Sequence, residues 1–182
     1  QSPYSASKIA ADQLAFSYEK SFDLPVKIVR PFNTYGPRQS ARAVIPTIIT
    51  QGLNGSPEFK LGNLAPTRDL TFVKDTCSAF LEIFHSDSFF GQVTNIGMNK
   101  EISIGDLAHE IMRIMEINCT ISTDKHRNRP EKSEVDRLVC NSTKLTSNSN
   151  WKARYNLQHG LKETIQWFRE NANSYKSEQY LV

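Results

Sequence analysis

The chain has 182 residues, 38% of them hydrophobic, which is enough for one globular domain with its own core or for a piece of a larger domain. The net charge of +3 comes from 22 basic and 19 acidic residues scattered along the sequence, so no basic stretch typical of nucleic-acid binding is present. No apolar run approaches the roughly 20 residues that cross a bilayer, and the first residues lack the pattern of a signal peptide. We therefore expect a cytoplasmic protein whose partner is neither a nucleic acid nor a membrane.

The first elements predicted along the chain are a helix, a strand and a second helix. The long first helix covers residues 4–22 and is capped by Ser2. A β-branched strand follows over residues 26–32. Residues 33–42 are polar and predict a loop, after which a helix of about ten residues begins at Ala43.

The rest of the chain continues this alternation. Asp75 is predicted to cap a helix that ends near residue 84, and Ser103 begins a capping box for another that ends near residue 115. The remaining predicted elements are strands at 58–61, 69–73, 93–96 and 120–123, a charged loop at 125–134 and a final helix at 157–168. Alternating helices and strands predict the α/β class.

The cysteine and histidine residues give no sign of a metal site or a disulfide framework. The three cysteines form no CxxC pair, and their odd number and wide spacing are atypical of both features. None of the four histidines has a nucleophile or further metal ligands at a typical spacing. We expect reduced cysteines that serve in packing, and no metal.

Tyr4 and Lys8 lie four residues apart at the start of the first predicted helix, so both side chains belong to one face. A cation within about 4 to 6 Å favours the phenolate form of a phenol, which could then accept a proton from a hydroxyl group. By itself this spacing is a weak signal, since it occurs by chance in many sequences. The alternative interpretation is that Tyr4 and Lys8 are simply two exposed side chains on the same face of a helix.

Four further segments follow this pair in the order found in the extended short-chain dehydrogenase/reductase family, which is also called the NAD-dependent epimerase/dehydratase family. They are residues 30–37 (RPFNTYGP), 43–46 (AVIP), 67–75 (TRDLTFVKD) and 126–134 (HRNRPEKSE). The chain resembles this family from Tyr4 to about Phe168. The resemblance covers the carboxy-terminal part of such an enzyme, because the family's glycine-rich cofactor loop and its catalytic serine or threonine would precede residue 1.

The resemblance implies a role for several residues. Tyr4 would be the catalytic acid/base, while Lys8 would assist it and hold the nicotinamide ribose. Tyr4, Lys8 and Pro31 would contact NAD, the implied cofactor.

The substrate of the family is a nucleotide-diphosphate sugar. Asn33, Ala43, Val44, Arg68 and Arg129 would bind it, the arginines through phosphate oxygens. From the residues alone, Asn33 also suits an ordinary turn and Arg68 a surface ion pair. Arg127 competes with Arg129 for the same role.

The implied fold is the carboxy-terminal part of a Rossmann-like, doubly wound parallel sheet interleaved with a small α/β substrate-binding domain. Residues 1–33 and 67–97 would belong to the dinucleotide-binding domain. Residues 34–66 and 98–172 would be mainly substrate domain, and 173–182 a tail.

Within the family, residues 30–46 most closely resemble bacterial nucleotide-sugar 4,6-dehydratases that act on UDP-N-acetylglucosamine in the legionaminic acid pathway. We therefore expect a UDP-linked substrate and a homodimer at full length, with the 182-residue chain alone inactive. A nucleotide-sugar 4-epimerase or a UDP-glucuronate decarboxylase is the alternative, since both share the C4 oxidation. A non-catalytic dinucleotide-binding relative is a second alternative, although it would need no Tyr4 and Lys8 pair.

Overall fold

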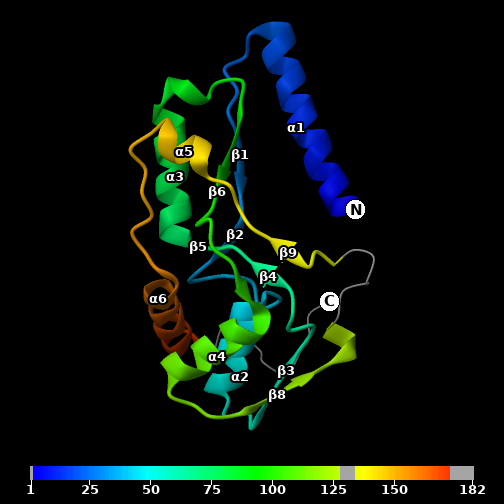
Figure 1. The fold of residues 1–182 in the computed structure, drawn as a ribbon, viewed down its shortest axis with the longest axis vertical. Coiled ribbons are helices and arrows are strands. Elements are labelled where there is room, and N and C mark those ends of the chain that lie inside the picture. The colour runs from blue at the N-terminus through cyan, green and yellow to red at the C-terminus, as the bar shows by residue number, and fades with distance from the viewer. Residues whose placement is uncertain (1, 128–133, 173–182) are drawn as a thin grey trace.

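The computed structural model describes residues 2–127 and 134–172, and Figure 1 shows its elements. The helices are α1 (Pro3–Phe22), α2 (Val44–Leu53), α3 (Val73–His85), α4 (Ile104–Met115), α5 (Thr143–Ser147) and α6 (Leu157–Glu170), with short 3-10 turns at Asp87–Phe89 and Lys125–Arg127. The strands are β1 (Ile28–Pro31), β2 (Asn33–Tyr35), β3 (Glu58–Leu61), β4 (Thr67–Arg68), β5 (Leu70–Phe72), β6 (Val93–Ile96), β7 (Ile102–Ser103), β8 (Thr120–Thr123) and β9 (Arg137–Leu138).

Parallel pairing dominates the short sheets of the described chain. Strand β1 pairs with β6, β2 with β5 and β3 with β8, in each case in parallel. Strand β4 is parallel to β9 and antiparallel to β7. Parallel neighbours need long crossover connections, and the helices supply them. This arrangement is the Rossmann-like α/β fold that the sequence predicted.

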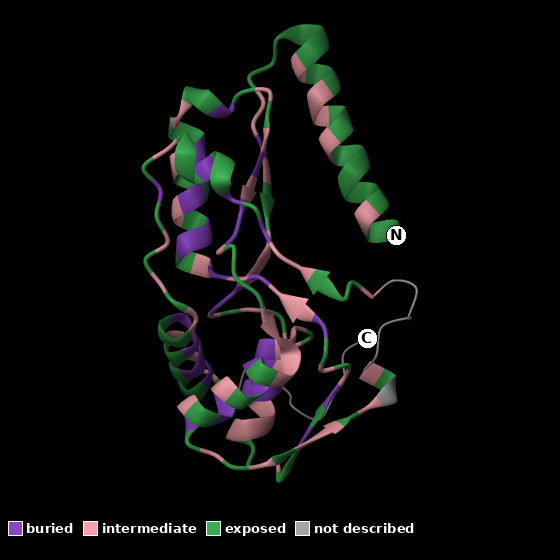
Figure 2. Ribbon diagram, viewed as in Figure 1, coloured by how far each residue is buried: buried purple, intermediate pink, exposed green. Residues whose placement is uncertain are grey.

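Most of the buried apolar side chains in the described part of the chain form two clusters. The larger, here the α2–α4–α6 cluster, joins those helices to β3, β2 and β5. Its buried members are Tyr35, Ile45, Ile48, Ile49, Phe59, Leu61, Phe72, Leu107, Ala108, Ile111, Met112, Met115, Leu161, Ile165 and Phe168. The smaller, here the α3–α5 cluster, consists of Ala79, Ile83, Phe89, Ile96, Leu145 and Trp151. Figure 2 shows the buried residues on the inner sides of the helices and in the strands that these helices cover.

Helix α1 contributes to neither cluster. Figures 1 and 2 show it beside the main body, and none of its residues is buried. The Ser2 hydroxyl accepts the Ser5 amide at its start, as predicted, and Asp23 ends it in the left-handed conformation. An ion pair of Arg30 with Asp12, with 2.7 Å between Nε and Oδ2, links the helix to β1. Within the described residues, no helix is long and apolar enough to span a membrane.

The predicted strand over residues 69–73 is wrong in its bounds, because the chain changes partners at Asp69. Strand β4 ends at Arg68 and β5 begins at Leu70, each in a different sheet. Helix α3 then begins at Val73.

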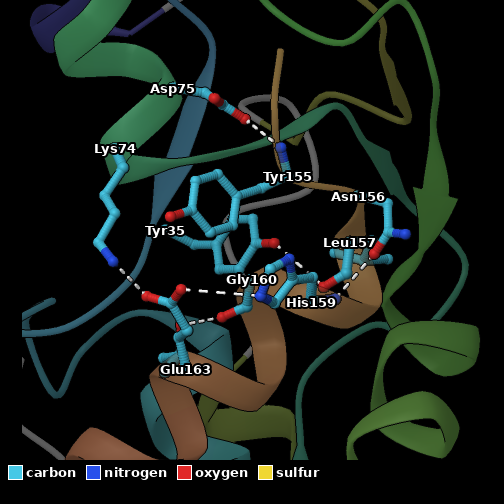
Figure 3. Close-up of polar contacts among 10 residues, drawn as sticks. Tyr35, Lys74, Asp75, Tyr155, Asn156, Leu157, His159, Gly160 and Glu163 are labelled. Atoms are coloured by element: carbon cyan, nitrogen blue, oxygen red, sulfur yellow. Dashed lines mark hydrogen bonds and ion pairs between the residues drawn. The ribbon is translucent and has the colours of Figure 1, made fainter.

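The predicted helix cap at Asp75 is also wrong. No side chain caps α3, and Asp75 is buried, with its two carboxylate oxygens accepting the backbone amides of Arg154 at 2.9 Å and Tyr155 at 3.0 Å. Figure 3 shows how this carboxylate and its surroundings fasten α6 to α3 and β2. The Tyr35 hydroxyl donates to the Leu157 carbonyl at 3.2 Å. The start of α6 is therefore held by groups from two other elements.

Candidate functional site

A pocket of about 300 Å³ lies where β2, β4, β5 and the starts of α2 and α4 meet. Four of the residues predicted to bind substrate, Asn33, Ala43, Val44 and Arg68, line it together. The other lining residues are Gln39, Arg42, Ile45, Thr47, Leu61, Gly62, Asn63, Pro66, Leu70, Ile104, Arg127 and Glu134. Segments up to about 100 residues apart in sequence therefore share one cavity.

Arg68 presents its guanidinium from β4 and is largely buried. Its Nη1 donates to the carbonyl oxygens of Thr67 at 2.8 Å and Val135 at 2.6 Å. Its Nη2 lies 2.6 Å from Glu134 Oε1, and only 13% of the Arg68 side chain and 16% of the Glu134 side chain are exposed. An arginine has five N–H donors, so the Nε–H and one Nη2 hydrogen remain for a ligand.

The start of α2 brings backbone amides to the same pocket. Ala43 is its N-cap residue and makes no side-chain cap, so the amides of Val44 and Ile45 have no acceptor within the helix. Pro46 follows without an N–H group. Such helix starts carry partial positive charge and favour anions.

Asn33 lies at the beginning of β2, paired in register with Leu70 of β5. Its side-chain amide donates to the Asp69 carbonyl at 3.1 Å. This bond fixes the plane of the side chain beside Arg68. The amide oxygen of Asn33 therefore has a defined direction at the pocket wall.

The sequence reasoning assigned no role to Arg42 or Glu134, which also line the pocket. Arg42 is exposed and forms no ion pair within the described part of the chain. Arg127, the competitor of Arg129, lies 3.5 Å from Asp124. Arg42 immediately precedes the matched segment 43–46, which was the available signal; for Glu134 only its place at the end of a charged loop could have pointed to it.

Tyr4, Lys8 and Pro31, which were predicted to contact NAD, do not line this pocket. Tyr4 is 71% exposed on α1, with Lys8 Nζ 5.5 Å from the centre of its ring, so the pair does share one helix face. Pro31 is exposed at the end of β1, in register with Ile96. Arg129 falls in 128–133, outside the described residues.

Three arginines, two backbone amides and one glutamate therefore surround a pocket with an apolar floor that includes Leu61, Leu70 and Ile104. Arginine guanidinium groups and backbone amides donate hydrogen bonds to phosphate oxygens, whereas a carboxylate accepts hydrogen bonds from hydroxyl groups. The pocket is chemically suited to a diphosphate joined to a sugar.

A family model for GDP-mannose 4,6 dehydratase matches residues 1–164. Human dTDP-D-glucose 4,6-dehydratase is 31% identical over an alignment of 180 residues that covers 96% of this chain and 50% of that enzyme. A trifunctional UDP-glucose 4,6-dehydratase/UDP-4-keto-6-deoxy-D-glucose 3,5-epimerase/UDP-4-keto-L-rhamnose-reductase of Arabidopsis thaliana is 32% identical over 93% of this chain and 25% of its own length. The chain thus spans half or less of these relatives.

Solved structures agree with the fold. A dTDP-glucose 4,6-dehydratase from Bacillus anthracis, determined in complex with NAD, has a TM-score of 0.84 at 32% identity, over 95% of this chain and 54% of that one. A UDP-glucuronic acid 4-epimerase from Bacillus cereus has a TM-score of 0.85 at 26% identity, over 93% and 53%. From residue 1 to residue 164 the chain therefore belongs to the GDP-mannose 4,6-dehydratase family, whose relatives matched here are nucleotide-sugar 4,6-dehydratases and epimerases.

Proposed function

We propose that the protein is an NAD-dependent nucleotide-sugar 4,6-dehydratase and that this chain holds its nucleotide-sugar site. The observation that carries the proposal is the pocket at which Arg42, Arg68 and Arg127 meet the uncapped start of α2. A diphosphate has the charge and the acceptor oxygens that these donors require. The dehydratases among the relatives support this choice of reaction.

The substrate would lie with its diphosphate against the arginines and Asn33. Tyr4 would remove the proton from the C4 hydroxyl of the sugar, with Lys8 beside it. Water would then be lost across C5 and C6. The groups that perform this elimination are not among the residues that we assign.

The residues present fit part of an NAD site. Tyr4 and Lys8 are both exposed on one face of α1, where a phenol and an ammonium can be offered to the same ribose. Pro31, exposed at the end of β1, would contact the nicotinamide. When bound, NAD would supply the hydride acceptor for the C4 oxidation and the hydride donor for the later reduction at C6.

The finer assignment is a UDP-linked substrate, with UDP-N-acetylglucosamine in a legionaminic-type pathway as the first candidate. This rests on the resemblance of residues 30–46. Among the relatives, one acts by name on dTDP-D-glucose and another on UDP-glucose, so both nucleotides belong in the test. We also propose a cytoplasmic location and a homodimer, with the domain division at residues 33/34, 66/67 and 97/98.

Epimerisation is the second candidate reaction. The observation behind it is the similarity to a UDP-glucuronic acid 4-epimerase, which matches the fold over 93% of this chain as closely as the dehydratase structure does. An epimerase or a decarboxylase would use the same C4 oxidation. A dinucleotide-binding relative without turnover is disfavoured by the Tyr4 and Lys8 pair.

Mass spectrometry, combined with NMR to identify stereoisomers of equal mass, separates these reactions. The full-length protein is incubated with NAD and with UDP-N-acetylglucosamine, dTDP-glucose or UDP-glucuronate. Loss of one water supports dehydration, an unchanged mass with a new sugar stereoisomer supports epimerisation, and loss of carbon dioxide supports decarboxylation. Absence of turnover with any nucleotide sugar would refute the enzyme assignment.

A further inference from the structure

Asp69 is a carboxylate with no exposed surface, placed between two pocket-lining residues, Arg68 and Leu70. It is also the residue at which the chain leaves one sheet for another. Strand β4, before it, pairs with β7 and β9, whereas β5, after it, pairs with β2. Any rotation of the backbone at this residue would therefore move both Arg68 and Leu70 relative to the pocket.

Four hydrogen bonds fix the position of Asp69. Its Oδ1 accepts the Met98 amide at 2.8 Å, and its Oδ2 accepts the Cys140 amide at 3.1 Å. Its own amide donates to the Leu138 carbonyl at 2.9 Å, and its carbonyl accepts the Asn33 side chain at 3.1 Å. One residue thus joins β2 and the segments that follow β6 and β9.

A neutral side chain could not replace this arrangement. An ionised carboxylate offers only acceptors, so each oxygen can receive an amide from a separate segment. Burying a carboxylate is costly unless it is hydrogen-bonded, and each Asp69 oxygen accepts one backbone amide. Gly97 permits the close approach, since a Cβ at that residue would lie 2.2 Å from the Cys140 Cβ and 3.3 Å from Asp69 Oδ2.

We propose that Asp69 is a positioning residue for the nucleotide-sugar pocket, acting on the ligand through Arg68 and Asn33. The inference rests on the proposed function and adds to it a residue that is not itself part of the pocket lining. Asp69 touches neither substrate nor cofactor. It sets the direction from which Arg68 and Asn33 present their donors and acceptors.

Asp75 provides a matched control. It is 1% exposed and also accepts two backbone amides, those of Arg154 and Tyr155, but none of these three residues lines the pocket. A loss of stability that is merely structural should be common to Asp69→Asn and Asp75→Asn. A loss of ligand affinity should be confined to Asp69→Asn.

The experiment measures the binding of UDP and dTDP to the full-length protein by isothermal titration calorimetry, beside the melting temperature. Asp69→Asn replaces one acceptor by a donor, so we expect Kd to rise about tenfold, while Asp75→Asn stays within about twofold of the unchanged protein. In turnover, Asp69→Asn should raise KM for the nucleotide sugar more than it lowers kcat, and leave KM for NAD unchanged.

The outcomes separate the two proposals. If the unchanged protein binds neither UDP nor dTDP, the proposed function fails. If it binds them and Asp69→Asn binds equally well, or if Asp75→Asn weakens binding to the same degree, the positioning role fails. Should Asp69→Asn not fold, amide hydrogen exchange of the unchanged protein is compared with and without UDP: slower exchange at Met98 and Cys140 when UDP is bound supports the role, and exchange that UDP leaves unchanged overturns it.

Discussion

Replacing Arg68 by lysine tests the pocket at its most buried cation. Lysine keeps the positive charge but loses the planar fork, so its single ammonium nitrogen cannot occupy the separate Nη1 and Nη2 positions that contact the Val135 carbonyl and Glu134 and also present a further donor to a phosphate. In the structure the Arg68 guanidinium donates three hydrogen bonds to the protein, two to the carbonyl oxygens of Thr67 and Val135 and one to the Glu134 carboxylate. The variant must therefore give up either a protein contact or a ligand contact.

The expected magnitude follows from one lost charge-assisted hydrogen bond. Such a bond contributes about 1.5–3 kcal/mol, which corresponds to a rise in Kd of about one to two orders of magnitude. The effect on the free energy of unfolding should be smaller than for Arg68→Ala, because Ala would leave the Glu134 carboxylate, only 16% exposed, without its partner.

The assay is isothermal titration of UDP and dTDP into the full-length protein, with the melting temperature measured in parallel. Arg137→Lys is the matched control, since Arg137 lies on the neighbouring β9, is 74% exposed, pairs with Glu101 and does not line the pocket. We expect no measurable change in Kd for it. Equal affinity of Arg68→Lys and the unchanged protein would refute the role of the Arg68 fork.

Three further predictions concern stability and reactivity. Gly160→Ala should lower the free energy of unfolding in urea by about 1–3 kcal/mol, because its Cβ would lie 2.2 Å from the Tyr35 hydroxyl, whereas Gly105→Ala, with no atom nearer than 3.6 Å, should be neutral or stabilising. Burial raises the pKa of Cys140 to about 12 and also raises the pKa of Tyr35. The free energy of unfolding in urea should therefore stay constant up to about pH 8 and fall as the pH rises through about pH 12, and an increase over that range would contradict this. The exposed Cys77 should react with iodoacetamide before Cys140, as read by peptide mass spectrometry, and the reverse order would show that Cys140 is accessible.

The elements that the sequence predicted most closely are those with a strong local pattern. Strands β3, β6 and β8 have the predicted bounds, because short apolar or β-branched runs are bordered by turn-forming residues. Helix α4 begins after Ser103, whose hydroxyl accepts the Asp106 amide as a capping box requires. A local sequence pattern was sufficient to predict these features.

The elements that the sequence missed depend on distant partners. Strand β2 lies in what was predicted to be the polar loop 33–42, and it becomes a strand by pairing with β5. Strands β7 and β9 have two residues each and exist only through β4. For the same reason Asp75 was expected to cap its own helix, while its actual partners lie some 80 residues further along.

The site shows the same division. Asn33, Ala43, Val44 and Arg68 were proposed from separate sequence motifs, and the fold brings them to one pocket. Glu134 could not be paired with Arg68 from the sequence, because 66 residues separate them. The roles of Tyr4 and Lys8 remain predictions, since the spacing of a helical pair gives no information on what its exposed face meets.

The two hydrophobic clusters alternate along the chain. From the N-terminal side, the chain first meets the α3–α5 cluster at Val29, a partly buried residue that packs against it. It then enters the α2–α4–α6 cluster at Tyr35 and returns to each cluster twice more. Neither cluster is made by one continuous segment, so no single cut or deletion can release either of them as an intact folding unit. Heating should accordingly unfold both clusters in one cooperative transition. Replacing one cluster alone in evolution would require the simultaneous replacement of three segments of the chain.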